Sequence, residues 1–452
     1  GVLRLGTALG ADGSASDRLV LDGPTAIASG STTVQVTNLS GLGALTSGNG
    51  IEVISARNGA NTTAQTTKSA FSLAGGHVDA GAYEYRLHAA DAGGAGENWY
   101  LRSTTNVVSP VDPVAPSPPD LPAAPPVVVP TYRAEASLYS ALPSQLRQGS
   151  LAMLGDLRKR VGDDDVKGTA AAPAGSQRRA WARVLSADID IRQGGTVSPT
   201  SKGRLTGVQA GTDLLAAPNW RAGLYVGQLD GDARVNGFAS GLQNLRVGRN
   251  DLRSQYVGIY GTYSGDSGLY ADAVVQSGRH RYTVQPNLGG GVEGKGRSLL
   301  GSIEVGQAFA LGASGWSVEP QLQLIHQHLD LNNSAIVGAV VQPEADSGWI
   351  ARAGIRVKGE LATGLGTLQP YGRFNVYKSS SGADVASFVN GATRTDIAAP
   401  VGGTSTELAG GFTLALGNTT SLYGEVGKLW SSGGDAKVKS SINASLGVRV
   451  KW

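Results

Sequence analysis

Two short stretches of this chain place reactive side chains at spacings that enzymes use. Gly265-Asp266-Ser267-Gly268 surrounds a serine with small residues, as a nucleophile loop often does, and His326 and His328 lie two apart, on one face of a strand. No histidine with a triad-like context accompanies Ser267, and no third ligand is indicated for a metal beside the two histidines. We therefore interpret the first stretch as a hairpin turn and the second as side-chain packing. The sequence predicts no enzyme activity, no catalytic residue, no metal site and no cofactor.

The composition excludes several other classes of function. The 452 residues include no Cys, so disulfides and thiolate chemistry are absent. The 38 basic and 35 acidic residues leave a net charge of +3, too balanced to indicate a nucleic acid partner. No run of consecutive apolar residues approaches the length of a transmembrane helix. The chain starts at a glycine with no signal peptide, so we expect it to be the C-terminal piece of a longer protein.

The first 130 residues predict short strands followed by a linker. Residues 1–105 carry short alternating runs, such as Thr33-Val34-Gln35-Val36-Thr37, between turns rich in Gly, Asn and Asp, which is an all-β pattern. Their spacing suits the coils of a β-solenoid fragment. Residues 106–130 are predicted to be an extended linker, because nine of the 24 residues from 107 to 130 are Pro.

Residues 131–162 change to a helical pattern. Pro143 is expected to kink this helix or to mark its real start, and Gly162 is a suitable C-cap. Residues 163–177 are predicted to be a connector. The apolar positions that carry the helical periodicity are Leu138, Leu142, Leu146, Met153, Leu154, Leu157 and Val161.

Residues 178–452 predict a closed barrel of long strands. Short turns alternate with longer loops, including those near 331–347 and 379–403, as in outer-membrane barrels, and the strand number is even. Both ends of the barrel then lie on the side of the short turns. The twelve alternating segments exceed the length that a tilted strand needs to span a bilayer: they lie near 178–192, 203–215, 219–231, 248–264, 268–283, 296–311, 316–330, 348–361, 366–378, 404–416, 420–431 and 441–452.

The last strand shows the clearest alternation between two faces. A lipid-facing side is predicted for one set of residues and a hydrated lumen for those between them, such as Arg449 and Lys451. A soluble barrel or sandwich would alternate as well, and it remains open at this point. The lipid-facing set is Ile442, Ala444, Leu446, Val448, Val450 and Trp452.

Several runs, in order along the chain, identify a family resemblance. The chain resembles the C-terminal part of classical monomeric autotransporters (type Va secretion) of the pertactin and AIDA type. The runs in the first region include Gly30-Ser31-Thr32-Thr33-Val34-Gln35-Val36, Gly81-Ala82-Tyr83-Glu84-Tyr85-Arg86-Leu87 and Asn98-Trp99-Tyr100-Leu101-Arg102. Those in the barrel include Trp181-Ala182-Arg183, Glu319-Pro320-Gln321-Leu322-Gln323-Leu324, Gln369-Pro370-Tyr371-Gly372-Arg373-Phe374 and Ser421-Leu422-Tyr423-Gly424-Glu425-Val426.

The resemblance implies an all-β fold: a twelve-stranded transmembrane β-barrel with an α-helix threaded through its pore, preceded by a β-solenoid fragment. Its implied function is to carry an N-terminal passenger across the Gram-negative outer membrane, with residues 1–105 at the cell surface as an autochaperone segment that seeds passenger folding. Implied partners are outer-membrane lipid, the barrel-assembly machinery, periplasmic chaperones and the chain's own passenger, with a monomeric barrel. Tyr83, Tyr85, Trp99 and Tyr100 are the candidates for packing the seed, and Leu446, Val448, Val450 and Trp452 for the assembly signal.

Some relatives cut their passenger at an Asn of the pore helix with the help of lumenal acids. Residues 131–161 contain no Asn, so we expect an uncut helix or cleavage elsewhere. The alternatives to a translocator are a porin-like channel, which needs an open lumen, and a surface adhesin fragment. The charges expected in the lumen around the helix are Arg183, Asp188, Asp190, Glu319, Arg373 and Glu425.

Overall fold

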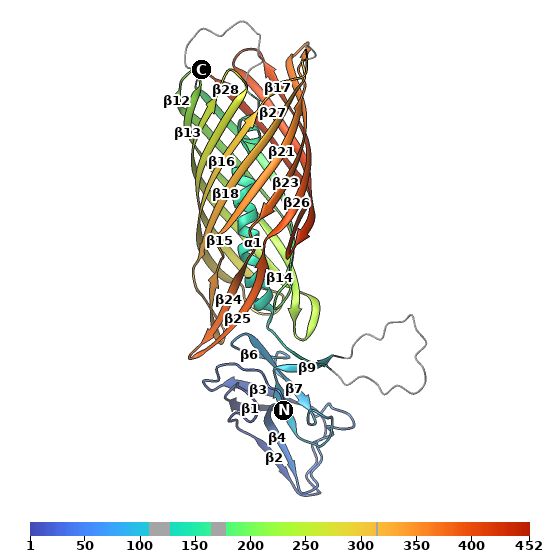
Figure 1. Cartoon of the computed structure of the whole chain (residues 1–452). Coiled ribbons are helices and arrows are strands. Elements are labelled where there is room, and N and C mark those ends of the chain that lie inside the picture. The colour runs from blue at the N-terminus through green and yellow to red at the C-terminus, as the bar shows by residue number, and fades with distance from the viewer. Residues whose placement is uncertain (108–126, 164–177, 313–314) are drawn as a thin grey trace, which may run out of the picture.

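The computed structural model describes residues 1–107, 127–163, 178–312 and 315–452. It consists of a cylinder of tilted strands with a helix along its interior, and a smaller β region next to one open end (Figure 1). Apart from its two ends, the predicted linker 106–130 lies outside the described residues, and so does the predicted connector 163–177 beyond Asp163.

Twelve antiparallel strands form the barrel, as predicted. The sheet closes where β11 pairs with β28 and β16 pairs with β18, so every barrel strand has two neighbours. Two short strands, β17 (Phe309–Ala310) and β22 (Leu361–Thr363), add to the rim on the short-turn side. The barrel strands are β11 (Arg179–Gln193), β12 (Thr200–Ala216), β13 (Trp220–Ala239), β14 (Leu242–Ser264), β15 (Leu269–Pro286), β16 (Val292–Gln307), β18 (Ser317–Leu331), β21 (Gly348–Lys358), β23 (Gly366–Ser379), β26 (Gly403–Leu416), β27 (Thr420–Gly434) and β28 (Ala436–Lys451).

The two faces of the last strand lie as predicted. Leu446 is 55% exposed on the outside, while Arg449 is 2% exposed inside the barrel. Apolar side chains can face lipid at no cost, whereas Arg449 finds hydrogen-bond acceptors in the lumen, the Val161 carbonyl at 3.0 Å among them.

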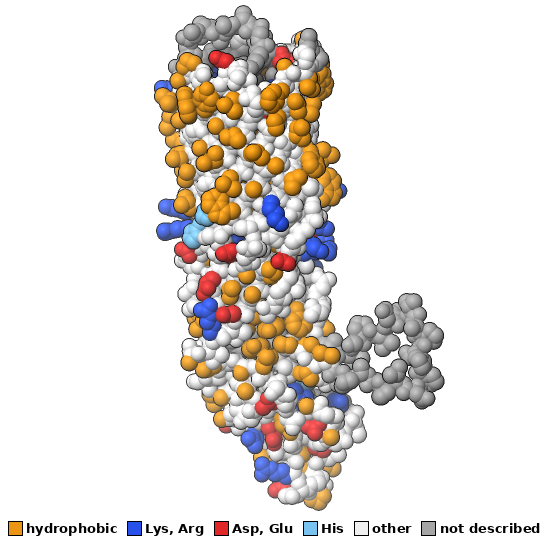
Figure 2. Space-filling view, in the orientation of Figure 1, with side chains coloured by type: hydrophobic (Ala, Val, Ile, Leu, Met, Phe, Trp, Pro, Cys, Tyr) orange, Lys and Arg blue, Asp and Glu red, His pale blue; other side chains and the backbone are white. Residues whose placement is uncertain are grey.

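A band of exposed hydrophobic side chains crosses the face of the barrel seen in Figure 2, on the side of the short turns. Exposed tryptophans lie near both of its edges: Trp220, Trp316 and Trp452 on the short-turn side, and Trp349 and Trp430 toward the long loops. Aromatic girdles of this kind mark the two interfaces of a bilayer. Among the described residues, no helix is both long and apolar enough to cross a membrane.

The prediction of plain loops near 331–347 and 379–403 was wrong. These segments form a separate four-stranded sheet of β19 (Ser334–Ile336), β20 (Ala339–Glu344), β24 (Gly382–Asn390) and β25 (Thr393–Val401). Its inner side chains, Val341, Phe388 and Ile397, are buried in the cluster that surrounds the helix. Burial of these apolar side chains against a distant part of the chain stabilises the sheet.

The helical segment has two parts, α1 (Ala134–Leu154) and α2 (Leu157–Val161). Pro143 was predicted either to kink the helix or to mark its start, and the second alternative was wrong, because Pro143 lies inside α1. The break comes instead at Gly155, which has φ of 62°, a conformation that suits glycine. Gly162 caps α2, as predicted, and donates its N–H to the Arg158 carbonyl at 2.9 Å.

The first region stacks parallel strands in the manner of solenoid coils. One sheet has the order β1 (Val2–Thr7), β3 (Thr32–Asn38) and β5 (Phe71–Leu73), and both of its pairs are parallel. The other has the order β2 (Leu19–Asp22), β4 (Ile51–Arg57), β8 (Trp99–Arg102), β7 (Tyr83–Ala89) and β6 (Val78–Ala80), and only its β2–β4 pair is parallel. The strands β9 (Thr104–Val107) and β10 (Val127–Pro130) pair with each other and lead into the helix. We call residues 1–107 the junction region.

Candidate functional site: the filled pore and the junction region

The half of the helix nearest the junction region is packed in apolar side chains. Leu138, Leu142 and Leu146 are at most 1% exposed and belong to one buried cluster with wall residues of β12, β13 and β14. The helix lies close to the wall, because a Cβ on Gly149 would lie 3.1 Å from Leu205. This half of the lumen is therefore filled by side chains.

The end of α1 meets a basic wall residue. Arg183 donates to the Met153 carbonyl at 2.8 Å, and Gln209 donates to the same oxygen at 3.0 Å. These last carbonyls have no partner within the helix, and a cation next to them is favourable. The wall thus satisfies the helix end inside the lumen.

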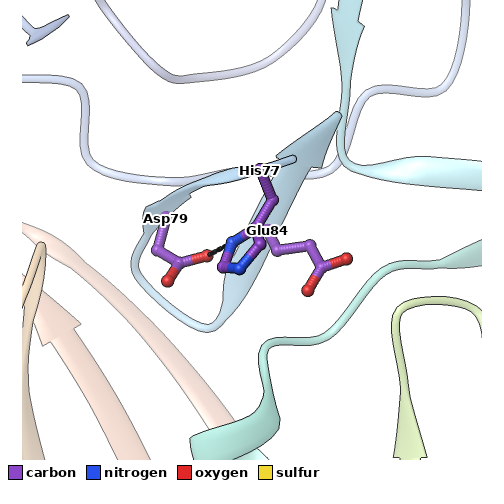
Figure 3. A group of neighbouring side chains, drawn as sticks. All are labelled: His77, Asp79 and Glu84. Carbon is purple, nitrogen blue, oxygen red and sulfur yellow. Dashed lines mark hydrogen bonds and ion pairs between the residues drawn. The ribbon is translucent and has the colours of Figure 1, made fainter. Parts of the chain in front are cut away.

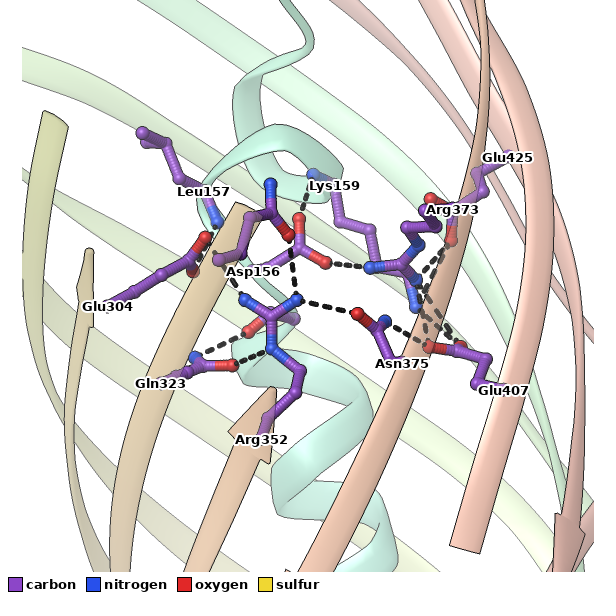
Figure 4. Close-up of polar contacts among 12 residues, drawn as sticks. Asp156, Leu157, Lys159, Glu304, Gln323, Arg352, Arg373, Asn375, Glu407 and Glu425 are labelled. Atoms are coloured by element: carbon purple, nitrogen blue, oxygen red, sulfur yellow. Dashed lines mark hydrogen bonds and ion pairs between the residues drawn. The ribbon is translucent and has the colours of Figure 1, made fainter. Parts of the chain in front are cut away.

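A buried ion network surrounds the break between the two helices (Figure 4). Asp156 caps α2 by accepting from the Lys159 N–H at 2.8 Å, and it also accepts from Arg373 on the wall. Arg373 in turn lies 2.7 Å from Glu425 and 3.2 Å from Glu407. All these wall residues are at most 7% exposed. The network ties the helix to strands β23, β26 and β27 on one side of the barrel.

The remaining charges of the helix pair with other strands. Arg160 lies 2.8 Å from Asp272 on β15, and Arg158 lies 3.2 Å from Glu319 on β18. In the opposite sense, Asp163 accepts from Arg356 on β21 at 2.9 Å. Cations of the helix therefore meet acids of the wall, and acids of the helix meet cations of the wall, around the circumference of the barrel.

Four of the six predicted lumen charges lie where they were expected. Arg183, Glu319, Arg373 and Glu425 are buried and contact the helix. The additional lumen charges that sequence reasoning missed have the same inward parity on their strands as the four it found, which is the signal that could have identified them. They include Asp272, Glu304, Arg352, Arg356 and Glu407, and the ion pair of Arg179 with Asp213.

The prediction was wrong for Asp188 and Asp190, which face outward. Asp188 pairs at 2.7 Å with Arg204, whose side chain is 57% exposed. The reason is the alternation of β11: Ile189 and Ile191 point inward, into the apolar cluster around α1, so the acids between them must point out.

The four aromatic residues predicted to pack the seed are all at most 8% exposed. The Tyr85 hydroxyl lies within hydrogen-bond distance of the Gly10 and Ala44 carbonyl oxygens, at 2.9 and 2.7 Å, so it connects two separate coils. Trp99 packs edge-on against Phe71 with ring centroids 5.3 Å apart, and its indole N–H donates to Thr62 at 3.0 Å. Tyr83 belongs to the same buried core and stacks on Tyr132, which packs against that core, while Tyr100 lies against Arg102.

The junction region is bonded to the long-loop end of the barrel. The Gly81 N–H donates to the Gly338 carbonyl at 2.9 Å, and Asn390 donates to the Gly41 carbonyl at 3.1 Å. Ser240, at the β13–β14 turn, donates to Glu84 at 3.0 Å. The barrel loops thus position the junction region directly over the mouth of the pore.

A sequence family model described as autotransporter beta-domain matches residues 180–427, more than half of the chain. The chain belongs to this autotransporter family. A second family, described as autochaperone domain type 1, matches residues 1–87. The chain is therefore an autotransporter translocator of the Gram-negative outer membrane, with the junction region of its passenger attached.

Similar proteins agree with this assignment. The chain is 30% identical to the adhesin BmaC autotransporter of Brucella suis, over 100% of this chain and 13% of that protein. It is 32% identical to the pertactin autotransporter of Bordetella bronchiseptica, over 49% of this chain and 24% of that protein. The chain thus spans a quarter or less of the length of these two relatives. The AIDA-I transport unit from Escherichia coli has the same fold, with a TM-score of 0.53, 17% identity and coverage of 71% of this chain and 100% of that chain.

The two stretches first considered for chemistry have structural roles in the autotransporter. Gly265 and Gly268 form a bonded turn between β14 and β15, as predicted, with the Gly268 N–H donating to the Gly265 carbonyl at 3.0 Å. His326 packs on Trp349 with ring centroids 4.6 Å apart, and His328 lies 2.7 Å from Ser347.

One polar cluster of the junction region has the residue types of a metal site. His77, Asp79 and Glu84 offer ligand atoms within 4.8 Å of one another (Figure 3). Both carboxylates already have cationic partners, since Asp79 lies 3.4 Å from Arg133 and Glu84 lies 2.5 Å from Arg86. The hydrogen bond that the His77 ring donates to the Asp79 carboxylate raises the pKa of His77. The arrangement favours an ion-pair cluster at the barrel mouth over a metal site.

Acidification is expected to loosen the junction region through His88. Burial, with Arg102 and Arg86 nearby, lowers the pKa of His88 to about 4. In the unfolded chain the His88 imidazole has a pKa of about 6.5, so it binds a proton more readily than in the folded chain. The free energy of unfolding therefore decreases as the pH drops below 6.5, by about 2 kcal/mol at pH 5. His77 acts in the opposite sense, since its raised pKa gives stability that is full at low pH and is lost as the pH rises.

The measurement is the rate of protease cleavage within residues 1–107 of the detergent-solubilised chain, at about pH 7.5 and about pH 5. The wild type should be cut faster at the lower pH, and a His88→Gln variant should lose most of this difference. His77→Gln is the matched control, because it removes the opposing histidine and should increase the difference. Equal rates for the wild type at both pH values would contradict the role of His88.

Proposed function

We propose that the junction region folds early on the cell surface and provides the template on which the passenger folds. Three features support this role: the region has its own buried core, its β1 and β2 strands lie at the ends of their sheets, and its last strand, β9, pairs with β10, which leads into the pore helix. A preceding coil can add to these edges in parallel, as coils of a solenoid do.

The contact between the junction region and the barrel mouth carries this proposal. The hydrogen bonds at Gly81, Asn390 and Ser240 hold the template where chain emerges from the pore. Each coil that folds outside removes unfolded chain from the exit, so folding gives a direction to transport without a nucleotide. The apolar wall around α1 and the polar network beyond it line the route that the passenger takes before the helix fills it.

The assembly of the barrel is proposed to need other proteins. Strand β28 closes the sheet on β11 and presents alternate apolar side chains to lipid, which is a suitable signal for the barrel-assembly machinery. We propose that Leu446, Val448, Val450 and Trp452 carry this signal, that periplasmic chaperones deliver the chain, and that the barrel works as a monomer.

We further propose that the translocator is not an enzyme and leaves its pore helix uncut. In support, the sequence of α1 and α2 contains no Asn, and the acids that approach this helix, such as Asp272, Glu319 and Glu425, are engaged in ion pairs. A carboxylate fixed by a cation is a poor base for backbone cleavage.

The test uses the chain expressed behind a signal peptide in Gram-negative cells. We expect a band that shifts on boiling in SDS gels, an uncut chain, and loss of residues 1–107 when protease is added to intact cells, with the barrel protected. A barrel that shifts on boiling but keeps residues 1–107 protected would contradict surface exposure. A chain that remains soluble without detergent would contradict the membrane barrel itself.

A further inference from the structure

The outer wall of the barrel carries a group of cations just beyond the hydrophobic band, on the long-loop side. Five basic residues project outward from three adjacent strands, β14, β15 and β16, and all five are exposed. We call them the cation group: Arg253, Arg279, Arg281, Lys295 and Arg297.

Strand register places like charges directly opposite one another in this group. Arg281 lies opposite Arg253 on one side and opposite Lys295 on the other, and Arg279 lies opposite Arg297. Directly opposed like charges on one sheet face are destabilising, because their Cβ atoms are only about 5 Å apart. Such an arrangement is costly unless an anion binds between the cations.

Acids of the same wall offset part of this charge: Asp251 and Glu293 line the same hollow as Arg253, Arg281 and Lys295, although Asp251 already pairs with Arg249 at 3.0 Å. Asp230 lies 2.6 Å from Arg253, and Asp330 stands opposite Arg297 in the register. Within the described ranges, Arg279, Arg281, Lys295 and Arg297 make no ion pair. Some outward arginines elsewhere have one, such as Arg204 with Asp188 at 2.7 Å.

An apolar groove lies next to the cation group, within the hydrophobic band. Its floor contains Gly261, Ala273 and Gly301, and its sides are Ile303, Leu324 and Trp349. The floor is open, because a Cβ on Gly261 or Gly301 would have no atom within 4 Å. Arg297 and Gly301 are four residues apart on β16, or about 13 Å along the strand.

We propose that the cation group and this groove together bind one phosphorylated lipid of the outer leaflet, with its phosphates between the arginines and an acyl chain over Gly261 and Gly301. Guanidinium groups suit phosphate oxygens in geometry and charge. A free anion would use the cations but not the groove, and an uncharged lipid would use the groove but not the cations.

The orientation toward the outer leaflet rests on the proposed function, but the binding test in detergent does not. The purified full chain is titrated with lipid A carrying its phosphates, with dephosphorylated lipid A, and with inorganic phosphate, and bound lipid is counted by native mass spectrometry. We expect phosphorylated lipid A to stay bound one per chain, the dephosphorylated form to bind far more weakly, and inorganic phosphate not to displace the lipid.

Two variants probe the two halves of the site. Arg279→Gln with Arg297→Gln should weaken lipid A binding about thirtyfold, since each lost cation near a membrane surface weakens binding about fivefold. Gly301→Leu should also weaken it, because the side chain fills the groove while the cations remain. A retained shift on boiling shows that each variant still folds.

The matched control is Lys202→Gln with Arg234→Gln. These residues also form a directly opposed cation pair on the outer wall. They lie farther from the hydrophobic band, because Lys202 is six residues along β12 from Val208, an exposed residue of that band. This control should change binding by less than about threefold. Equal loss in both double variants, equal affinity for dephosphorylated lipid A, or displacement by inorganic phosphate would each overturn the proposal.

Discussion

Deleting residues 1–177 is expected to raise the single-channel conductance of the barrel in planar bilayers by roughly an order of magnitude, because a barrel of this strand number encloses a wide lumen once nothing fills it. In the intact chain the helix occupies that lumen along both its apolar and its ionic part. Leu138, Leu142 and Leu146 are buried against the wall in the first, and Arg160 is 1% exposed in the second.

The control for this deletion is a chain that begins at Tyr132, which keeps the helix and removes only the junction region and linker. It should conduct as little as the full chain. Both shortened chains should still shift on boiling, because the twelve strands close on each other without the helix. Equal conductance of the two would refute the role of the helix as a plug and would favour a porin-like channel.

Replacing Arg373 by Met is expected to cost about 3 kcal/mol of stability and to lower the temperature at which the boiling shift occurs. The variant leaves Asp156, Glu407 and Glu425 close together after removal of the cation that contacts all three. Breaking a buried ion network by removing one partner is strongly destabilising, since the remaining charges stay desolvated. Lys159 is the cation that remains, at 3.3 Å from Glu407 and 3.2 Å from Glu425.

Arg204→Met is the matched control for Arg373→Met. It also removes an arginine from an ion pair, with Asp188, but Arg204 is 57% exposed on the outer wall. A surface pair contributes at most about 1 kcal/mol, so this variant should melt close to the wild type. If both variants lost the same stability, the buried ion network would contribute no more to stability than a surface ion pair does.

The strand count and the outer face could be predicted from the sequence because lipid imposes a local rule on them. Every second residue of a lipid-facing strand must be apolar, so Leu446, Val448 and Val450 reveal their facing without any tertiary information. The same reasoning applies to Arg183 and Arg373, which share strands with clearly lipid-facing neighbours.

The errors arise where the barrel extends beyond the membrane. There the lumen is apolar, because it packs around α1, so the usual rule of polar side chains inside reverses. Asp188 was placed inside for its charge, whereas Ile189 occupies that face. The sheet of β19, β20, β24 and β25 was missed for a related reason: its stability comes from burial of Phe388 against Tyr139, which is more than two hundred residues away in the chain.

The spacing of the ionic contacts on α2 has a mechanical consequence. Within this single turn, Arg158, Lys159 and Arg160 reach acids on β18, β26, β27 and β15, so the turn is fastened to several sides of the cylinder at once. A force that pulls the passenger away from the cell acts along the axis of α1. The ion pairs of α2 share this force, so they must break together before the helix can move. A passenger that remains attached to this helix therefore resists shear at the cell surface, because the pulling force is distributed over strands on several sides of the barrel.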